Sequence, residues 1–235
     1  MSIEENVKAI KERMRQAAIQ AGRDPNTFLL SAATKMNDAD AVRRAIRAGV
    51  DCCGENKVQE LTEKLAQNAY EGVPVHFIGH LQTNKVKFVV GKVELIQSVD
   101  SLRLLEAIQK QAEKVGCVQD ILLEVNVALQ ESKSGFTVEE LPSVLEKMAA
   151  FSNIRVRGFM AIPPIAENPT GNHKFFQEMC NLSVDITTKK YDNVLVDILS
   201  MGMSDDYADA IACGSTMVRV GTAIFGKRNY VTTHS

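Results

Sequence analysis

Apolar and polar residues alternate along the whole chain in two recurring patterns. Short apolar runs are followed by longer stretches in which apolar side chains recur every three or four positions. The first pattern is typical of a buried β-strand and the second of an amphipathic helix. We expect strands at 28–34, 50–54, 75–79, 93–98, 121–127, 154–162, 194–199 and 218–221. We expect helices at 3–21, 37–49, up to 69, 83–90, 101–115, 138–150, 171–189 and 204–214.

These elements predict an α/β fold in which each of eight strands is followed by a helix or a helical turn. Eight such units are typical of a (β/α)8 TIM-like barrel, here with an extra N-terminal helix. The alternative is an open doubly wound sheet, but eight evenly spaced units in 235 residues favour a closed barrel. The sequence has no linker and no low-complexity tract. We therefore expect a single domain over residues 1–235.

Composition narrows the function classes. The hydrophobic fraction is 45%, the charged fraction is 24% and the formal net charge is −2. This is an ordinary globular composition, without the positive charge that would draw the chain to nucleic acid or an anionic membrane. No apolar stretch approaches the roughly 20 residues that cross a bilayer. The early acids Glu4 and Glu5 argue against a signal or transit peptide, so we expect a cytoplasmic protein.

The cysteines do not indicate a metal site or a disulfide framework. There are five, an odd number, and no CxxC pair or Cys/His spacing typical of zinc binding occurs. Reduced, buried thiols are the expected state. The positions are Cys52, Cys53, Cys117, Cys180 and Cys213.

The apolar run of the first strand ends at Lys35, directly before the next helical pattern. Proteins with α/β folds place their chemistry at the carboxyl ends of strands. Packing around a lysine amine lowers its pKa, and the neutral amine can form a Schiff base with an aldehyde. The alternative is a side chain that reaches past the strand end into water.

The loops after the last two strands resemble a phosphate-binding cradle. Ser200, Gly202 and Ser204 follow one strand, and Gly221 and Thr222 follow the next. Barrel proteins often hold phosphate there through backbone N–H groups, although glycine and serine also occur in ordinary turns. Neither GxGxxG nor GxxxxGK[ST] is present, so a dinucleotide or nucleoside triphosphate is not indicated. A reactive amine facing a phosphate cradle is what a pyridoxal 5′-phosphate (PLP) site needs.

Arg219 interrupts the apolar eighth strand two residues before Gly221, so both lie on the same face. A guanidinium can only donate hydrogen bonds. Facing a pyridine nitrogen, it would keep that nitrogen unprotonated and so disfavour chemistry that builds a full carbanion, such as transamination. The alternative is a salt bridge inside the barrel with a strand carboxylate.

Further polar residues follow other strands at the same end of the fold. Helix capping explains Asn56 and Asn84 as well as ligand binding does. The full set, with one methionine near the end of the sixth strand, is Asn56, Gln82, Asn84, Lys85, Asn126, Lys133 and Met160.

Two pairs of residues are interpreted as structural. His76 and His80 straddle a strand and a loop, whereas the HExxH metal motif needs a helix. Asp205 and Asp206 are better explained as the charged start of a helix than as a catalytic dyad.

These segments together resemble the YggS/PROSC family of PLP homeostasis proteins. The matches run in order over nearly the whole chain, and the last two are long and specific. The matching segments are Thr34-Lys35, Gly54-Glu55-Asn56, His76-Phe77-Ile78-Gly79, Leu81-Gln82-Thr83-Asn84-Lys85, Lys133-Ser134-Gly135, 158–163, 199–206 and 214–226.

The resemblance implies a barrel like the N-terminal domain of alanine racemase, with PLP held as a Schiff base on Lys35. It implies that the phosphate binds Ser200, Gly221 and Thr222, that Arg219 lies near the pyridine nitrogen, and that Asn56 lies near the ring. Met160 and Met201 complete the expected cofactor-binding set. Family members are thought to buffer PLP and deliver it to apo-enzymes, without an established catalytic activity.

One segment departs from the family pattern. Many members have Ser-Lys-Thr-Lys-Pro at the first strand, whereas this chain has Thr34-Lys35-Met36-Asn37-Asp38. The second lysine and the proline are absent. If that lysine helps to transfer PLP, transfer is altered here, while Schiff-base formation is expected to persist.

Two functions follow, a non-catalytic PLP carrier and a weak amino-acid racemase. Racemisation needs acid–base groups on both faces of the α-carbon. In alanine racemases the second group comes from another domain, which we do not expect here, and only Lys133 or Tyr207 could replace it. The carrier is favoured, and a PLP-independent scaffold would require an unmodified Lys35. The expected partners are PLP and apo-PLP enzymes, and the expected state is a monomer or weak dimer.

Overall fold

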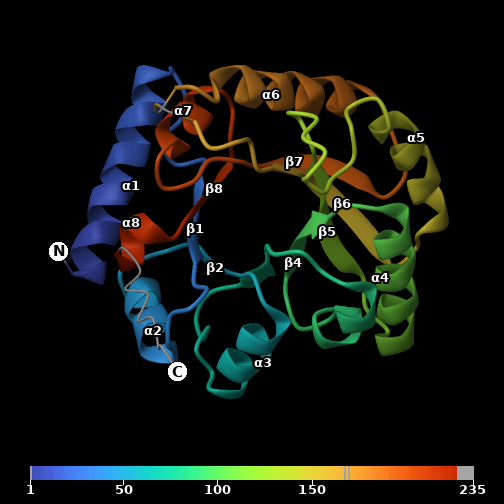
Figure 1. Ribbon diagram of the computed structural model, residues 1–235, viewed down its shortest axis with the longest axis horizontal. Helices are drawn as coiled ribbons and strands as arrows, with labels where there is room; N and C mark the ends of the chain where they lie inside the picture. Colours follow the sequence, from blue (N-terminus) through green and yellow to red (C-terminus); the bar gives the residue numbers. More distant parts are fainter. Residues whose placement is uncertain (1, 167, 169, 227–235) are drawn as a thin grey trace.

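Eight parallel strands surround the centre of the molecule (Figure 1). They are β1 (Leu29–Ala33), β2 (Cys52–Glu55), β3 (Val75–Phe77), β4 (Leu95–Val99), β5 (Gln119–Val125), β6 (Ile154–Ala161), β7 (Val194–Ser200) and β8 (Met217–Val220). The strands pair in chain order, and β8 closes the barrel by pairing with β1. The computed structural model describes residues 2–166, 168 and 170–226. The predicted (β/α)8 barrel is confirmed; that all 235 residues form one domain stays a prediction.

Helices form a ring outside the strands (Figure 1). They are α1 (Ile3–Gln20), α2 (Ala39–Arg47), α3 (Val58–Ala66), η1 (Thr83–Phe88), α4 (Leu102–Val115), α5 (Leu141–Glu146), η2 (Lys147–Ala150), α6 (His173–Thr188), α7 (Tyr207–Ala212) and α8 (Thr222–Phe225). The extra helix α1 lies beside α7 and α8, and the Asn6 amide donates a 2.8 Å hydrogen bond to the Ile224 carbonyl. Because α8 has only four residues, α1 covers the side of the barrel that a longer last helix would cover.

Several predicted boundaries are confirmed and others shift. Asp38 and Ser101 cap α2 and α4, each accepting from a backbone N–H three residues later. The predicted helix at 83–90 is instead a short 3-10 helix, η1. The predicted helix at 138–150 begins only at Leu141, next to Pro142, and changes to a 3-10 helix at Lys147. Within the described residues, no helix is long and apolar enough to cross a membrane.

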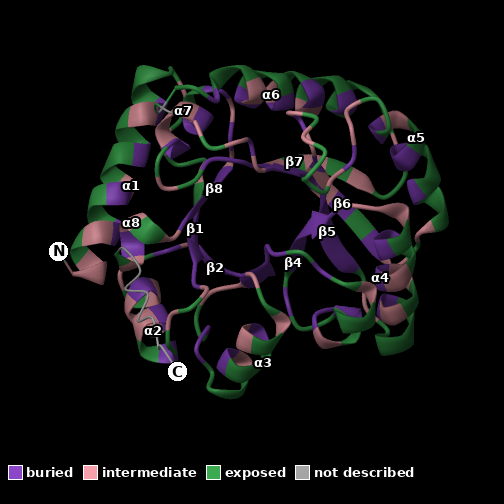
Figure 2. Ribbon diagram, viewed as in Figure 1, coloured by how far each residue is buried: buried purple, intermediate pink, exposed green. Residues whose placement is uncertain are grey.

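The strands separate two apolar regions. A large one fills the space between barrel and helices, and most strand residues are buried (Figure 2). A small one fills the barrel interior and consists of Cys52, Leu95, Leu122, Met160 and Met217. Paired residues on adjacent parallel strands lie on the same face, so the register identifies further inward-facing residues. Ser31 pairs with both Cys52 and Arg219, and Ser200 pairs with both Met160 and Met217.

A glycine in β6 turns Met160 inward. Gly158 has a φ of 137°, and a Cβ there would lie 1.9 Å from the Ile198 carbonyl oxygen. The register of β6 shifts at this point against both neighbouring strands. Such a bulge changes which face the following side chains occupy. As a result Phe159 packs outside the barrel and Met160 inside it.

The amino-terminal end of the barrel carries a network of ion pairs. Asp120 of β5 accepts from Arg155 at 2.7 and 2.8 Å and from Arg157 at 2.7 Å. Arg157 also pairs with Asp197 of β7. The Asp120 side chain is only 10% exposed, so this network links three strands at a partly dehydrated position. The paired charges at this end are expected to stabilise the barrel rather than to form a reactive site.

Candidate functional site at the carboxyl end of the barrel

Lys35 lies where the sequence predicts it, at the carboxyl end of β1. Ser31 and Ala33 occupy the inner face of the strand, and period-two alternation extends that face to Lys35, which is half-buried. Thr34 anchors the preceding residue, since its hydroxyl contacts the Gly54 carbonyl at 3.2 Å and Glu55 Oε1 at 2.5 Å. The turn then passes through Met36, whose φ is 62°, before Asp38 starts α2. The backbone around Lys35 is therefore held on both sides.

Arg219 spans three strands at the barrel mouth. It is 5% exposed, and its guanidinium donates to the Ser200 carbonyl at 2.8 Å, to Ser200 Oγ at 2.6 Å and to the Ala161 carbonyl at 2.9 Å. Burial lowers the pKa of Arg219 to about 10, so it keeps its charge at neutral pH. No carboxylate forms an ion pair with it among the described residues. The alternative interpretation of Arg219 as half of an interior salt bridge is therefore wrong, since its acceptors are two carbonyl oxygens and a hydroxyl.

A chain of hydrogen bonds continues from Arg219 through the barrel interior. The Ser200 hydroxyl donates to Gln97 Oε1 at 2.7 Å, and Gln97 Nε2 lies 2.9 Å from His76 Nδ1. The Ser200 hydrogen is thus used within the protein, and its oxygen accepts from Arg219. This places Ser200 as a support for the guanidinium; its predicted phosphate contact stays a prediction.

The two halves of the predicted cradle lie side by side. The Arg219 N–H donates to the Gly202 carbonyl at 3.0 Å, and the Ala223 N–H donates to Ser204 Oγ at 3.3 Å. Gly202 has a φ of 94°, and a Cβ there would lie 2.6 Å from the Ala210 Cβ, so only glycine fits. A Cβ at Gly221 would lie 3.3 Å from the Ala33 carbonyl oxygen. Small residues thus leave the backbone of both loops accessible.

The two other predicted residues of this cradle, Thr222 and Met201, differ in solvent exposure. Thr222 opens α8 and is exposed, whereas Met201 is fully buried. The Thr222 hydroxyl can therefore reach a ligand, and Met201 contributes packing beneath the loop.

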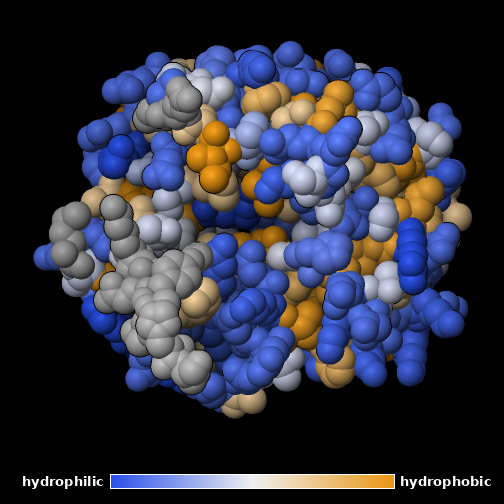
Figure 3. All heavy atoms as spheres, in the orientation of Figure 1, coloured by the Kyte–Doolittle hydropathy of each residue, from blue (hydrophilic) through white to orange (hydrophobic). Residues whose placement is uncertain are grey.

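Asn56 lines a cavity beside the mouth. The cavity has a volume of about 580 Å³ and is bordered by Asn56, Lys57, His80, Gln82, Lys85 and Phe88. Asn56 Oδ1 is buried and has no hydrogen-bond partner in the described part of the chain. A buried amide oxygen without a donor is unusual, and it favours a bound molecule that supplies one. The face of the molecule seen in Figure 3 is hollowed near its centre, where hydrophilic and hydrophobic residues meet.

Other predicted residues have structural surroundings. Asn126 fixes its own loop by exchanging two hydrogen bonds with the backbone of Gln130, at 2.9 and 3.0 Å. Asp206 accepts from the Met203 N–H at 2.7 Å and from Asn172 at 2.9 Å, which confirms its interpretation as part of a helix start. Lys133 is exposed on the loop after β5.

The two histidines do not share a site. His76 lies inside the barrel beside Gln97, and His80 is exposed and lies 3.2 Å from Asp100. The interpretation of both as structural rather than as a metal pair agrees with these contacts.

Glu124 is an inward-facing acid that sequence reasoning missed. It pairs in register with Met160, on the strand that also carries inward-facing Leu122. Burial, with a smaller contribution from Asp100, raises the pKa of Glu124 to about 7, although Arg219 opposes this. The sequence does contain a signal for it: Glu124 is an acid inside an apolar strand, two residues after Leu122, so both lie on the same face. The mouth thus holds a carboxyl group that titrates near neutral pH.

Comparison with known proteins identifies the family. Residues 2–229 match the model of the family described as alanine racemase, N-terminal domain. A curated pyridoxal phosphate homeostasis protein of Aquifex aeolicus is 41% identical over 226 residues, which cover 96% of this chain and 98% of that protein. The chain belongs to the family of pyridoxal phosphate homeostasis proteins. The resemblance drawn from its motifs is confirmed.

Solved structures agree with this assignment. A protein from Bifidobacterium adolescentis, described as unknown, superposes with a TM-score of 0.87 at 37% identity, covering 95% of this chain and 94% of that one. PipY of Synechococcus elongatus, solved with PLP bound, gives a TM-score of 0.78 at 29% identity, covering 91% and 99%. Both share the barrel over nearly its full length.

Proposed function

We propose that this chain binds PLP at the carboxyl end of its barrel and takes part in PLP homeostasis, by buffering the cofactor and delivering it to apo-enzymes. The observation that carries this is the placement of Lys35 at the same barrel mouth as buried Arg219 and the two glycine loops. The family membership of the chain and the PLP-bound structure of PipY support it.

The residues at the mouth fit the three functional parts of PLP. Lys35 would form the Schiff base with the aldehyde, with loss of one water. The backbone around Gly221, with the Thr222 hydroxyl, would hold the phosphate, and Ser200 would contribute through Arg219 or directly. Asn56 Oδ1, buried without a partner among the described residues, would accept from the ring side of the cofactor. Met160, fully buried inside the barrel, would pack beneath the cofactor, and Met201, fully buried on the outer side of the barrel, would support the loop that contacts it.

Arg219 argues for holding the cofactor rather than for strong activation of it. Bound PLP supplies an aldehyde and an electron-withdrawing ring, and that ring withdraws electrons well only when its nitrogen is protonated. Arg219 is charged, fixed by three hydrogen bonds and unable to accept a proton at neutral pH. Facing the pyridine nitrogen, it would donate and keep that nitrogen unprotonated. A carrier has only to hold the cofactor, so it does not need a protonated pyridine nitrogen.

A weak amino-acid racemase is the second candidate, because the family model is that of an alanine racemase domain. Racemisation would need a second acid–base group opposite Lys35, and the residues considered for this role are poorly placed. Tyr207 is 3% exposed and its ring lies 5.8 Å from the Arg13 guanidinium of α1, outside the barrel. Lys133 is exposed on a loop. Glu124, with its pKa near 7, is the group in the mouth that would favour catalysis.

Reduction with borohydride tests the proposal. PLP added to the full chain and fixed by reduction should label the peptide that contains Lys35, and Lys35→Ala should lose this label and the visible absorption. Lys85→Ala and Lys133→Ala are matched controls, because both lysines are exposed near the mouth and should leave labelling unchanged. Label found mainly at Lys85 or Lys133 would contradict the site.

A second measurement separates carrier from enzyme. The PLP-loaded protein is incubated with a panel of amino acids in D₂O, and exchange of the α-proton is followed. Rapid exchange that is lost in Lys35→Ala would favour the racemase. No exchange, together with activation of an added apo-enzyme, would favour the carrier.

A further inference from the structure

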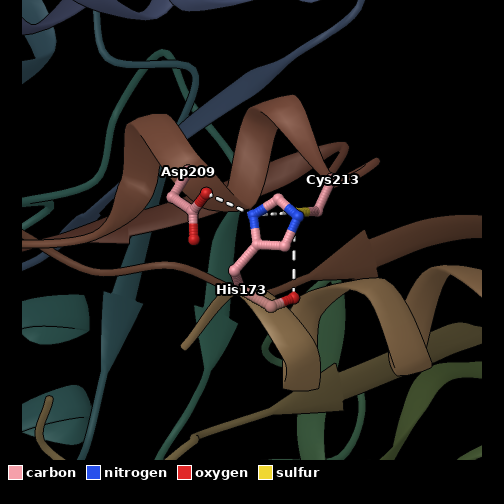
Figure 4. Close-up of side chains that lie close together, drawn as sticks. All are labelled: His173, Asp209 and Cys213. Atoms are coloured by element: carbon pink, nitrogen blue, oxygen red, sulfur yellow. Dashed lines mark hydrogen bonds and ion pairs between the residues drawn. The ribbon is translucent and has the colours of Figure 1, made fainter. Parts of the chain in front are cut away.

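Three side chains with metal-binding atoms meet between α6 and α7, outside the barrel (Figure 4). The imidazole of His173, at the start of α6, points toward Asp209 and Cys213, which lie one turn apart in and just after α7. His173 Nδ1 lies 2.8 Å from Asp209 Oδ1 and 3.3 Å from Cys213 Sγ. One ligand atom from each residue lies within 4.8 Å of the other two.

The surroundings leave part of this cluster unsatisfied. The Asp209 side chain is only 9% exposed, and its second oxygen, Oδ2, is buried with no hydrogen-bond partner among the described residues. Cys213 is 5% exposed, whereas the His173 side chain is 57% exposed. A buried carboxylate oxygen without a donor is costly, and a cation at this point would remove that cost.

A nucleophilic Cys–His–Asp triad is a poor description of the same residues. Such a relay needs the acid on one imidazole nitrogen and the thiol on the other. Here Asp209 and Cys213 both face Nδ1, and Nε2 lies 3.9 Å from the sulfur. Burial, with Asp209 and Cys180, also raises the pKa of the Cys213 thiol to about 11. A raised pKa does not favour a nucleophilic thiolate.

We propose that His173, Asp209 and Cys213 form a binding site for a divalent transition-metal ion of the Zn²⁺ class. Thiolate, imidazole and carboxylate are the ligands that Zn²⁺ takes in proteins. With a neutral imidazole, the two negative ligands balance the charge of the ion. Binding breaks the Cys213 S–H bond, forms a metal–sulfur bond and releases one proton to solvent.

The geometry suits a tetrahedral ion with one open position. Ligand bonds of about 2.0 to 2.3 Å place tetrahedral ligand atoms roughly 3.3 to 3.8 Å apart. The separation between His173 Nδ1 and Cys213 Sγ already falls there, and exposed His173 can move the remaining fraction of an ångström away from Asp209. The ligand atoms of Asp209 and Cys213 lie within 4.8 Å of each other, so they approach each other when the ion binds. Three protein ligands leave a fourth position for water on the exposed side of His173. The ion would tie α6 to α7, whose starts are already joined by Asn172 and Asp206.

Metal titration of the full chain tests the proposal, with PLP-free and PLP-loaded protein in parallel so that failure of PLP binding does not affect the result. Zn²⁺ should bind one per chain in the micromolar range or tighter, with release of one proton, and Co²⁺ should give a thiolate charge-transfer band. His173→Gln and Cys213→Ser should each weaken Zn²⁺ binding at least 10-fold, and Cys213→Ser should abolish the cobalt band. Cys117→Ser and His80→Gln are matched controls that should bind as the parent does.

Any of three outcomes would overturn the site. One is the absence of Zn²⁺ binding up to about 100 μM, a concentration at which even a weak site would be occupied. The second is Zn²⁺ binding that persists unchanged in His173→Gln, which replaces an exposed side chain and should fold normally. The third is a cobalt band that persists in Cys213→Ser. Circular dichroism of each variant checks folding.

Discussion

The two ends of the barrel use arginine in opposite ways. At the amino-terminal end, Arg155 and Arg157 both pair with Asp120, and Arg157 also reaches Asp197. At the carboxyl end, Arg219 is more deeply buried but has only neutral oxygens of Ser200 and Ala161 as hydrogen-bond acceptors. Glu124 and Asp206 act on Arg219 electrostatically, but neither forms an ion pair with it among the described residues. A buried guanidinium without a directly bound carboxylate is costly, which favours a role with a ligand.

The contrast extends to unsatisfied groups. At the mouth, Asn56 Oδ1 is buried without a partner among the described residues, and two loops carry glycines that no other residue could replace without crowding. At the amino-terminal end, by contrast, the charged groups of Asp120, Arg155, Arg157 and Asp197 pair with one another. One end therefore contributes stability and the other keeps binding capacity, as expected for this fold. Substitutions at the two ends should separate folding stability from PLP affinity.

Asp120→Ala should have the largest effect on stability. It removes the carboxylate shared by two arginines and leaves Arg157 partly buried, which we expect to lower the free energy of unfolding by about 3 kcal/mol. Chemical denaturation measures this, and PLP affinity of the folded protein should be unchanged. Asp197→Asn, at a more exposed position, is the control and should cost less than about 1 kcal/mol. A large loss of PLP affinity in Asp120→Ala would contradict the division between the two ends.

Arg219→Met should have the opposite profile. Loss of the guanidinium should weaken PLP binding about 10- to 100-fold, or roughly 1.4 to 2.8 kcal/mol. The absorption spectrum of bound PLP should also shift if Arg219 faces the ring nitrogen, as proposed above. Arg219→Lys keeps the charge but not the fork of donors, and it should recover only part of the affinity. Unaltered affinity and spectrum in Arg219→Met would separate Arg219 from the cofactor.

The sequence predicted the fold well because each βα unit carries its own local signals. The apolar run before Lys35, the caps Asp38 and Ser101 and the even spacing of strands do not depend on distant contacts. The helix predicted at 83–90, which is η1 in the structure, was less predictable. Six residues form only a 3-10 helix there, and the preference between these two helix types is small enough for packing to decide it.

The candidate site was predictable only in part. Lys35, Arg219 and Gly221 stand at strand ends, so position alone indicated them. The partners of Ser200 could not be found, because Gln97 is 103 residues away and meets it only inside the closed barrel. The cluster of His173, Asp209 and Cys213 was not predicted for the same reason. His173 and Cys213 are 40 residues apart, and their spacing does not match the metal-binding motifs considered above.

Ser200→Ala and Thr222→Ala should distinguish support of Arg219 from contact with phosphate. Ser200→Ala leaves Gln97 Oε1 and one Arg219 donor unpaired inside the barrel, so we expect a loss of about 1 to 2 kcal/mol in stability. Thr222→Ala changes an exposed residue and should leave stability unchanged. Competition by inorganic phosphate against PLP should weaken a few-fold in Thr222→Ala and stay unchanged in Ser200→Ala. The reverse pattern in the phosphate experiment would assign the phosphate contact to Ser200.

Glu124 should produce the smallest effect, a pH dependence at the mouth. Its pKa is raised from 4.5 to about 7 in the folded chain, so between these values the folded state binds more protons than the unfolded state. The stability that this group contributes is therefore present at low pH and is lost as pH rises through about 7.

Glu124→Gln removes this titration. Relative to the parent, the variant should gain about 1 kcal/mol between pH 5 and pH 8, a value that allows for partial exposure of the carboxyl group. Denaturation at several pH values measures it, and Glu140→Gln, an exposed acid on the outer surface, is the control. Parallel pH profiles for Glu124→Gln and the parent would mean that the carboxyl group is well hydrated. The mouth would then be wetter than the burial of Arg219 implies, and a bound cofactor would have to displace that water to face the guanidinium.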